Sequence, residues 1–201
     1  MATTYLFNGS AIVTPFTIVS NEPHFDMTTV SLKTQRSSQG HQRWELAFST
    51  VNTDTTEVDA LLGAIQNFDQ AQTMIMPQLP SCQGDHFNTD PNVYQSYTAG
   101  TTTVRISKGG TTGKLPKGSF VTFSNHDKLY ITTNELDLTT LAAADVGIYP
   151  ALKTSVTSSH TLQTASNCLL TYYMDIDNAM GVTFSDGILS NTGTISLVEA
   201  V

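Results

Sequence analysis

The chain has 201 residues, which is enough for one large domain or two small ones with a buried core. Only 13% of the residues are charged, and the abundance of Thr, Ser and Asn favours strands and turns. The net charge of −8 without any cluster of Lys or Arg argues against a dedicated nucleic-acid binder, and the lack of a long apolar run argues against membrane insertion.

Residues 1–20 predict two short strands. Pro15 limits the second of them to a sheet edge or a bulge, because proline has no N–H to donate to a β-ladder.

A β-hairpin is predicted next, because apolar residues alternate with polar ones on both sides of a turn at residues 37–41. The alternating positions are Val30, Leu32 and Thr34 on the outgoing strand, and Trp44, Leu46 and Phe48 on the return strand. Trp44 and Phe48 lie on one face, which commits that face to a core or to an interface. They are our candidate interface residues, because aromatic anchors are enriched in protein interfaces, although core packing also accounts for them.

The spacing then changes to that of a helix near residues 55–70. Asp54 or Thr55 caps it, and Glu57 stands three residues after Asp54, as in a capping box. The apolar stripe consists of Val58, Leu61, Leu62, Ile65 and Phe68. A further strand is predicted over residues 72–79.

Residues 81–100 lack periodicity and are interpreted as a connection between domains. Short strands follow from about residue 101 to 165, around Val104 and Ile106, around residues 120–123, and around residues 129–131 after a tight turn at 125–127. Strands with turn signals every ten residues or so suggest a compact barrel or sandwich. Residues 168–174 and 194–198 predict the last strands. The predicted fold class is mainly β with one α-helix.

Motifs that carry chemistry are weak. The stretch Lys108–Lys114 resembles a phosphate loop but has Lys108 and Leu115 where glycine and a hydroxyl residue are needed, so a plain turn is favoured. Asp175–Asn178 resembles the start of a calcium loop, but Ala179 occupies a ligand position, which favours a solvated turn.

The remaining candidates are isolated. The histidines His24, His41, His86, His126 and His160 show no metal-ligand spacing, and folding alone could bring some of them together. Glu135 and Asp137 are a pair of carboxylates without the sign of a cleft. Cys82 and Cys168 are expected to be reduced thiols in a protein made and kept on the cytosolic side. We predict no catalytic residues, no metal and no cofactor, and therefore no enzyme.

The order of these features resembles a known family. Gly40–Leu46 before a short helix, followed by Pro77–Pro80, looks like the N-terminal part of the distal tail proteins of long-tailed (siphovirus-type) bacteriophages. Lys117–Phe123 and Lys128–Thr132 are similar to an oligonucleotide/oligosaccharide-type (OB-like) barrel inserted in one branch of that family, and Gly193–Glu199 resembles its last strand.

The resemblance implies a discontinuous ring-forming domain of residues 1–90 and 165–201 and an inserted barrel of residues 91–164. It implies a virion structural protein at the distal end of the tail, in the baseplate, assembled in the host cytoplasm as a homohexameric ring. Its partners would be the tail tube protein and the tip or receptor-binding proteins. DNA would only pass through the lumen, and the barrel would be free to bind carbohydrate during host attachment. The alternatives are a tail tube or terminator subunit and a carbohydrate-binding tail module.

Overall fold

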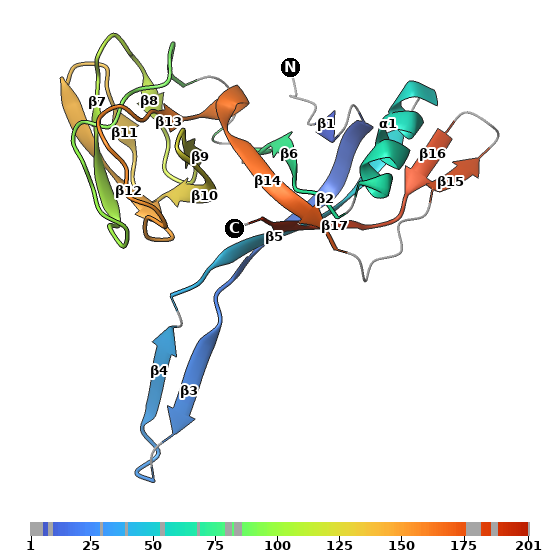
Figure 1. Ribbon diagram of the computed structural model, residues 1–201, viewed down its shortest axis with the longest axis horizontal. Coiled ribbons are helices and arrows are strands. Elements are labelled where there is room, and N and C mark those ends of the chain that lie inside the picture. Colours follow the sequence, from blue (N-terminus) through green and yellow to red (C-terminus); the bar gives the residue numbers. More distant parts are fainter. Residues whose placement is uncertain are drawn as a thin grey trace. The chain divides into compact units, whose positions relative to one another are not determined.

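The computed structural model describes residues 6–7, 10–28, 30–38, 40–52, 55–67, 69–78, 82, 86–175, 182–185 and 189–200 (Figure 1). These residues are mainly β, as predicted, with antiparallel sheets and a single α-helix among them. The chain forms two compact units. The central unit consists chiefly of Ala71–Tyr172, and the terminal unit consists of Phe7–Gln70 and Tyr173–Glu199. The units divide near residues 70 and 172, whereas the domain boundaries expected from the sequence lie near 90 and 164; that domain assignment stays a prediction.

The terminal unit is a sheet with one helix. Its elements are β1 (Leu6–Phe7), β2 (Ser10–Asn21), β3 (His24–Thr28), β4 (Thr34–Ser38), β5 (Arg43–Asn52), α1 (Thr55–Gln66), β15 (Val182–Ser185), β16 (Leu189–Thr192) and β17 (Ile195–Glu199). Strand β5 pairs antiparallel with β2 on one side and with β17 and β16 on the other. Segments near both ends of the chain therefore belong to one sheet.

The hairpin predicted from residues 30–48 is wrong in its pairing. The ladder joins β2 to β5, and it continues as a ladder between β3 and β4, so the chain reverses at residues 30–33. Val30 and Leu32 lie at this reversal, where both are exposed and Leu32 has a φ of +61°. Their alternation in the sequence is not that of a strand. The prediction for Pro15 is confirmed, because the β2–β5 register shifts between Val13 and Thr17.

The face of β5 that carries Trp44, Leu46 and Phe48 is buried, as the period-2 pattern predicts. The Phe48 ring packs edge-on against Phe7 at 5.2 Å between centroids and stacks on Phe16 at 5.7 Å. Aromatic pairs at these separations add to the stability gained from burial. The sheet core of the terminal unit is therefore built around the return strand that the sequence identified.

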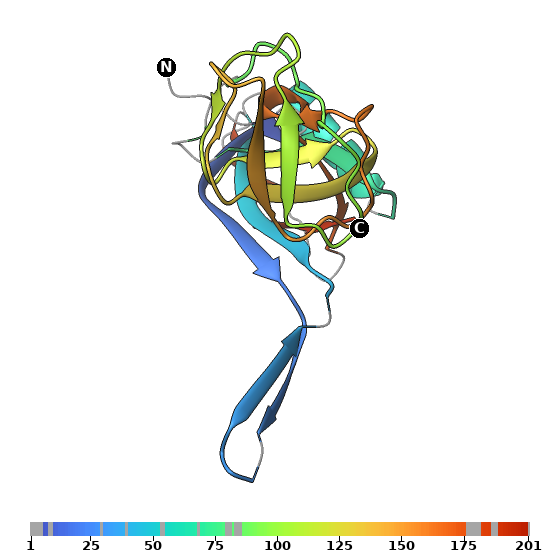
Figure 2. The same cartoon turned by 90° about the vertical axis from the view of Figure 1, so that its left-hand side faces the viewer.

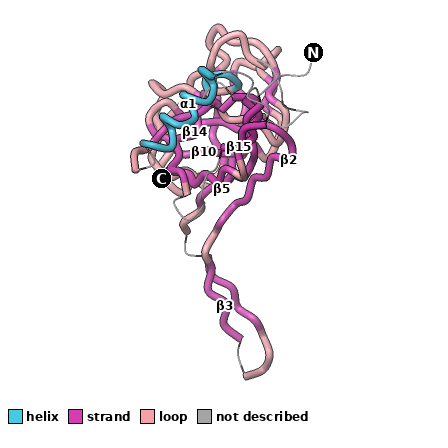
Figure 3. Tube along the Cα trace, turned by 90° about the vertical axis from the view of Figure 1, so that its right-hand side faces the viewer, coloured by secondary structure: helices cyan, strands magenta, loops and turns pink. Residues whose placement is uncertain are grey.

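Helix α1 confirms the helix predicted near 55–70, and it contacts β2 and β5 (Figure 3). Ala64 is buried, whereas Leu62, which the predicted apolar stripe included, is exposed. The cap Asp54 and the last stripe residue Phe68 lie outside the described residues.

The central unit contains β6 (Gln72–Ile75), β7 (Thr103–Ser107), β8 (Lys114–Leu115), β9 (Phe120–Phe123), β10 (His126–Thr132), β11 (Leu136–Asp137), β12 (Ala143–Tyr149), β13 (Leu162–Gln163), the 3₁₀ helix η2 (Ala165–Asn167) and β14 (Leu169–Met174), whose last two residues belong to the terminal unit. One sheet has the order β13-β9-β10-β12-β7, β8 pairs with β11, and β6 pairs with β14. The tight turn predicted at residues 125–127 lies one residue earlier, because His126 already belongs to β10. The assignment of this unit to the OB-like type stays a prediction.

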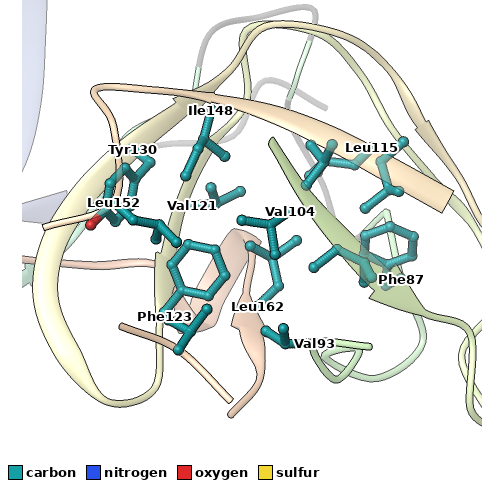
Figure 4. Close-up of a cluster of buried hydrophobic side chains, with 14 of the residues drawn as sticks. Phe87, Val93, Val104, Leu115, Val121, Phe123, Tyr130, Ile148, Leu152 and Leu162 are labelled. Atoms are coloured by element: carbon teal, nitrogen blue, oxygen red, sulfur yellow. The ribbon is translucent and has the colours of Figure 1, made fainter. Parts of the chain in front are cut away.

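A continuous apolar core fills the central unit (Figure 4). Its side chains come from every strand of the five-membered sheet in the described residues and from the loops between them, and most are less than 1% exposed. The side-chain amide of Gln78 pairs with the backbone of Phe120 in β9, as the backbone of a neighbouring strand would. The amide donates to the Phe120 carbonyl oxygen at 3.1 Å and accepts from the Phe120 N–H at 2.8 Å.

Candidate functional site

The stretch Lys108–Lys114 is a turn, as the sequence analysis favoured. The Thr111 N–H donates to the Lys108 carbonyl oxygen at 2.7 Å, and strand β8 follows where a phosphate loop needs a helix N-terminus. Gly113 has a φ of +141°, and a Cβ added there would lie 1.8 Å from the His86 carbonyl oxygen. The glycine is thus required for close backbone packing.

The calcium-like stretch lies mostly outside the described residues. Of Asp175–Asn178 only Asp175 is described, and its N–H donates to the Ser196 carbonyl oxygen at 3.0 Å. Among the described residues, no three His, Cys, Asp or Glu side chains lie close enough together to hold a metal ion.

The carboxylates Glu135 and Asp137 share one cation. Lys114 Nζ lies 2.6 Å from Asp137 Oδ2 and 3.7 Å from Glu135 Oε1. The hydrogen bonds from Lys114 and Thr139 lower the pKa of Asp137 to about 2. A carboxyl group that stays ionised at neutral pH is a poor general acid, so this pair is best described as a surface ion cluster.

Cys82 and Cys168 are both buried, and neither forms a disulfide. Burial raises the pKa of the Cys168 thiol. A thiol that remains protonated is a weak nucleophile, which suits a packing role.

The candidate interface residues Trp44 and Phe48 lie inside the terminal unit, with 6% and 2% of their surface exposed. Packing accounts for both of them. Their role in an interface stays a prediction.

The most exposed apolar groups lie on a segment in which the sequence did not predict the strand at residues 24–28. Strands β3 and β4 continue beyond β2 and β5 as a two-stranded ribbon, which we call the arm (residues 24–38) (Figures 1 and 2). Every residue of β3 is exposed. An isolated two-stranded ribbon is marginally stable in water at best, which makes the exposed arm a candidate binding surface.

The two faces of the arm differ. Residues directly opposite each other in a ladder share a face, and the register pairs Phe25 with Ser37 and Met27 with Gln35. Phe25 and Met27 are 68% and 66% exposed, so this face is apolar at its centre. The arm therefore has one apolar face and one polar face.

The polar face of the arm holds an ion pair. Asp26 pairs with Arg36 across the ladder, and the guanidinium donates to both carboxylate oxygens, at 2.8 and 3.1 Å. These hydrogen bonds lower the pKa of Asp26. The signal that could have found the arm is the alternation of polar and apolar residues over 24–28, but the outgoing strand was predicted around Val30, Leu32 and Thr34 instead.

A second candidate is a polar chain at the start of β10, around His126. His126 Nε2 lies 2.7 Å from the Tyr130 hydroxyl, and Nδ1 lies 2.9 Å from Asn125 Oδ1. The amide oxygen can only accept, so Nδ1 carries the proton and Nε2 accepts from Tyr130. The Tyr130 hydroxyl in turn accepts from the Lys153 N–H at 3.0 Å.

This chain of hydrogen bonds requires a neutral imidazole. Burial, followed by repulsion from Lys153, lowers the pKa of His126 from 6.5 to about 4. The ring also stacks on Phe123 at 5.9 Å between centroids. All the described hydrogen bonds of His126 and of its partners are to groups of the central unit. This hydrogen-bond network joins strand β10 to the loop at residues 153–155 and therefore has a structural role.

No protein-family model and no curated protein matches this chain. No helix in the described part is long and apolar enough to cross a bilayer. The geometry of the molecule is therefore the basis for a functional proposal, and the described residues offer exposed apolar strand surface on the arm.

Proposed function

We propose that the protein is a virion structural protein, the distal tail (baseplate hub) protein of a long-tailed phage. Copies of the chain form a ring, expected to be a hexamer, that joins the tail tube to the tail tip and continues the DNA channel. The observation that carries the proposal is the sheet of the terminal unit, in which β5 is flanked by β2 from the N-terminal segment and by β17 from the C-terminal segment.

This arrangement is the one that the family resemblance implies for a ring-forming domain. A sheet that gathers both ends of the chain leaves the middle of the sequence free to form a separate compact unit, which here consists chiefly of Ala71–Tyr172. The role of the ring is mechanical, and the chain does not act as an enzyme.

The surface chemistry also supports assembly. With 13% charged residues, the chain has a surface of hydroxyls and amides, which cost less to desolvate than ammonium or carboxylate groups. Fully exposed apolar groups on the arm are a further liability for an isolated subunit, because large exposed apolar surface favours association. Finally, the net charge of −8 suits the wall of a channel through which DNA passes without being bound.

Multi-angle light scattering on the purified full chain tests the proposal. A ring of six copies has six times the 21.7 kDa of the monomer. Negative-stain electron microscopy then separates a closed ring from the stacked, unlimited tubes of a tail tube subunit. A monomer at concentrations near 100 µM, or long tubes, would be evidence against a distal ring.

One observation favours carbohydrate binding as a second role, carried by the central unit. Tyr94 is exposed, and the Arg105 guanidinium lies 5.5 Å from its ring centroid. Exposed aromatic rings flanked by polar groups are suited to stacking on sugars. A glycan array probed with the wild-type chain and with Tyr94→Ala tests this role. We expect the wild type to bind one class of glycan and the variant to bind none.

A further inference from the structure

We infer that the arm of one copy of this chain docks through its Phe25/Met27 face onto the exposed apolar surface of β6 and β14 of a second copy. The inference rests on the proposed function, since it names the contact that would join neighbouring subunits. It concerns two surfaces that the sequence analysis did not assign.

The distribution of apolar groups on the arm favours a protein partner. Phe25 and Met27 occupy one face along the length of β3, while Asp26 and Arg36 form an ion pair on the other face. A ribbon with one apolar and one charged face is suited to lying flat on another surface. Val30 and Leu32 at the reversal are exposed as well. Insertion of the whole ribbon into lipid would, however, also bury this ion pair, which favours a protein partner.

The charge of the arm favours a second copy as that partner. The arm, residues 24–38, contains one acid, Asp26, and two bases, Lys33 and Arg36, so its net charge is +1, and the rest of the chain carries −9, which gives the total of −8. Two copies repel each other through most of their surfaces, because like charges oppose approach. The arm is a segment that can approach an acidic copy without that repulsion, and its two bases favour the approach.

The same chain offers a matching acceptor surface. Strand β6 is an edge strand whose neighbour in the sheet is β14. Ile75 of β6 lies opposite Leu169 of β14. Both side chains point to the same face and remain 51% and 40% exposed. Exposed apolar residues that share one face of a sheet mark a surface on which another apolar face can pack. Together, Ile75 and Leu169 give the Phe25/Met27 face an apolar surface on which to pack.

The contact is heterologous, because the two surfaces differ. Contacts of this kind propagate from one copy to the next and close into a ring when the rotation allows, whereas pairing of two identical arms would stop at a dimer. The arm-to-β6/β14 contact is thus the type that a ring requires.

The test uses two variants of the full chain. The arm variant is Phe25→Ser with Met27→Ser, and the acceptor variant is Ile75→Ser with Leu169→Ser. All four residues are exposed, so each variant is expected to keep the wild-type unfolding transition. The matched control, Thr28→Ser with Thr34→Ser, changes the polar face of the same ribbon at a directly opposed pair.

Light scattering over a dilution series measures the concentration at which half of each protein is assembled. We expect each apolar variant to need about a hundredfold more protein than the wild type, and the control to match the wild type. In an equimolar mixture, one intact arm can meet one intact acceptor. Two variants that are monomers alone are therefore expected to give a species of twice 21.7 kDa when mixed.

Other results overturn the inference in distinguishable ways. Assembly of the wild type and of the arm variant alike removes the arm from the interface and leaves the proposed function standing. An acceptor variant that assembles normally while the arm variant does not shows that the arm docks elsewhere. If the wild type stays monomeric, the proposed function fails too. If it is monomeric and sediments with phosphatidylcholine–phosphatidylglycerol vesicles only when the arm is intact, the partner is a lipid surface.

Discussion

The central unit and the arm show opposite ways of using a β-ribbon. In the central unit, strands curl around a shared apolar core, and residues such as Phe123 and Tyr130 are completely buried. In the arm, the same alternation of side chains leaves Phe25 and Met27 in solvent. Period-2 patterning therefore creates an apolar face without determining what covers it, and the cover is what distinguishes a core from a binding surface.

The strongest test of this comparison is to remove one aromatic side chain from each region. Phe123→Ala should lower the free energy of unfolding by about 3–5 kcal/mol, because it removes a buried ring and leaves a cavity. Phe25→Ala should change it by less than about 0.5 kcal/mol. Urea unfolding of both variants, at a protein concentration at which the chain is monomeric, measures the difference. A cost above about 2 kcal/mol for Phe25→Ala would mean that the arm is packed within its own chain.

A second pair of variants tests the close backbone packing at Gly113. Gly113→Ala should cost about 2–4 kcal/mol, because the new Cβ meets the backbone of His86. Gly100→Ala, with a φ of +89° but open space around it, should cost only the conformational penalty of about 1–2 kcal/mol. Thermal unfolding compares the two. Equal losses would show that conformation alone accounts for the requirement at Gly113.

A third pair concerns a side chain that replaces a strand. Gln78→Ala should cost about 2–3 kcal/mol, because it leaves the buried N–H and carbonyl of Phe120 without these partners. Gln42→Ala removes an exposed hydrogen bond to Ser20 and should cost less than about 0.5 kcal/mol. Urea unfolding checks both, and a small loss at Gln78 would mean that water replaces the amide.

The sequence was informative where the signal is local. The alternation of Trp44, Leu46 and Phe48 and the helical spacing after residue 55 involve only near neighbours in the chain. The buried face of β5 and the existence of α1 were predicted correctly, whereas Leu62 of the predicted apolar stripe is exposed. The pairing of β2 with β5 was not predicted, because which strands pair depends on contacts that no local pattern records.

The misplaced elements have the same origin. Val30 and Leu32 alternate like strand residues, but the longer β2–β5 ladder and its continuation into β3 and β4 place them at the reversal. The role of Gln78 was equally unreadable, because its partner Phe120 is 42 residues away. His126 was predicted in a turn because its neighbours Asn125 and Asp127 are turn formers, whereas its partner Tyr130 holds it at the start of a strand.

The smallest expected effect is the pH dependence contributed by His126. Its pKa is about 4 in the folded protein and 6.5 as an ordinary value, so between these two pH values the unfolded chain binds more protons. The free energy of unfolding should therefore be at its full value above pH 6.5 and fall by about 1–2 kcal/mol as the pH is lowered to 4, the amount being reduced by partial exposure of the ring. His126→Gln keeps an acceptor for Tyr130 but does not titrate, and it should flatten this part of the profile. Gln42→Ala provides the control, since it changes an exposed residue that does not titrate and should leave the slope unchanged. Urea unfolding at half-unit pH steps measures all three proteins, and an unaltered slope in His126→Gln would assign the dependence to another group.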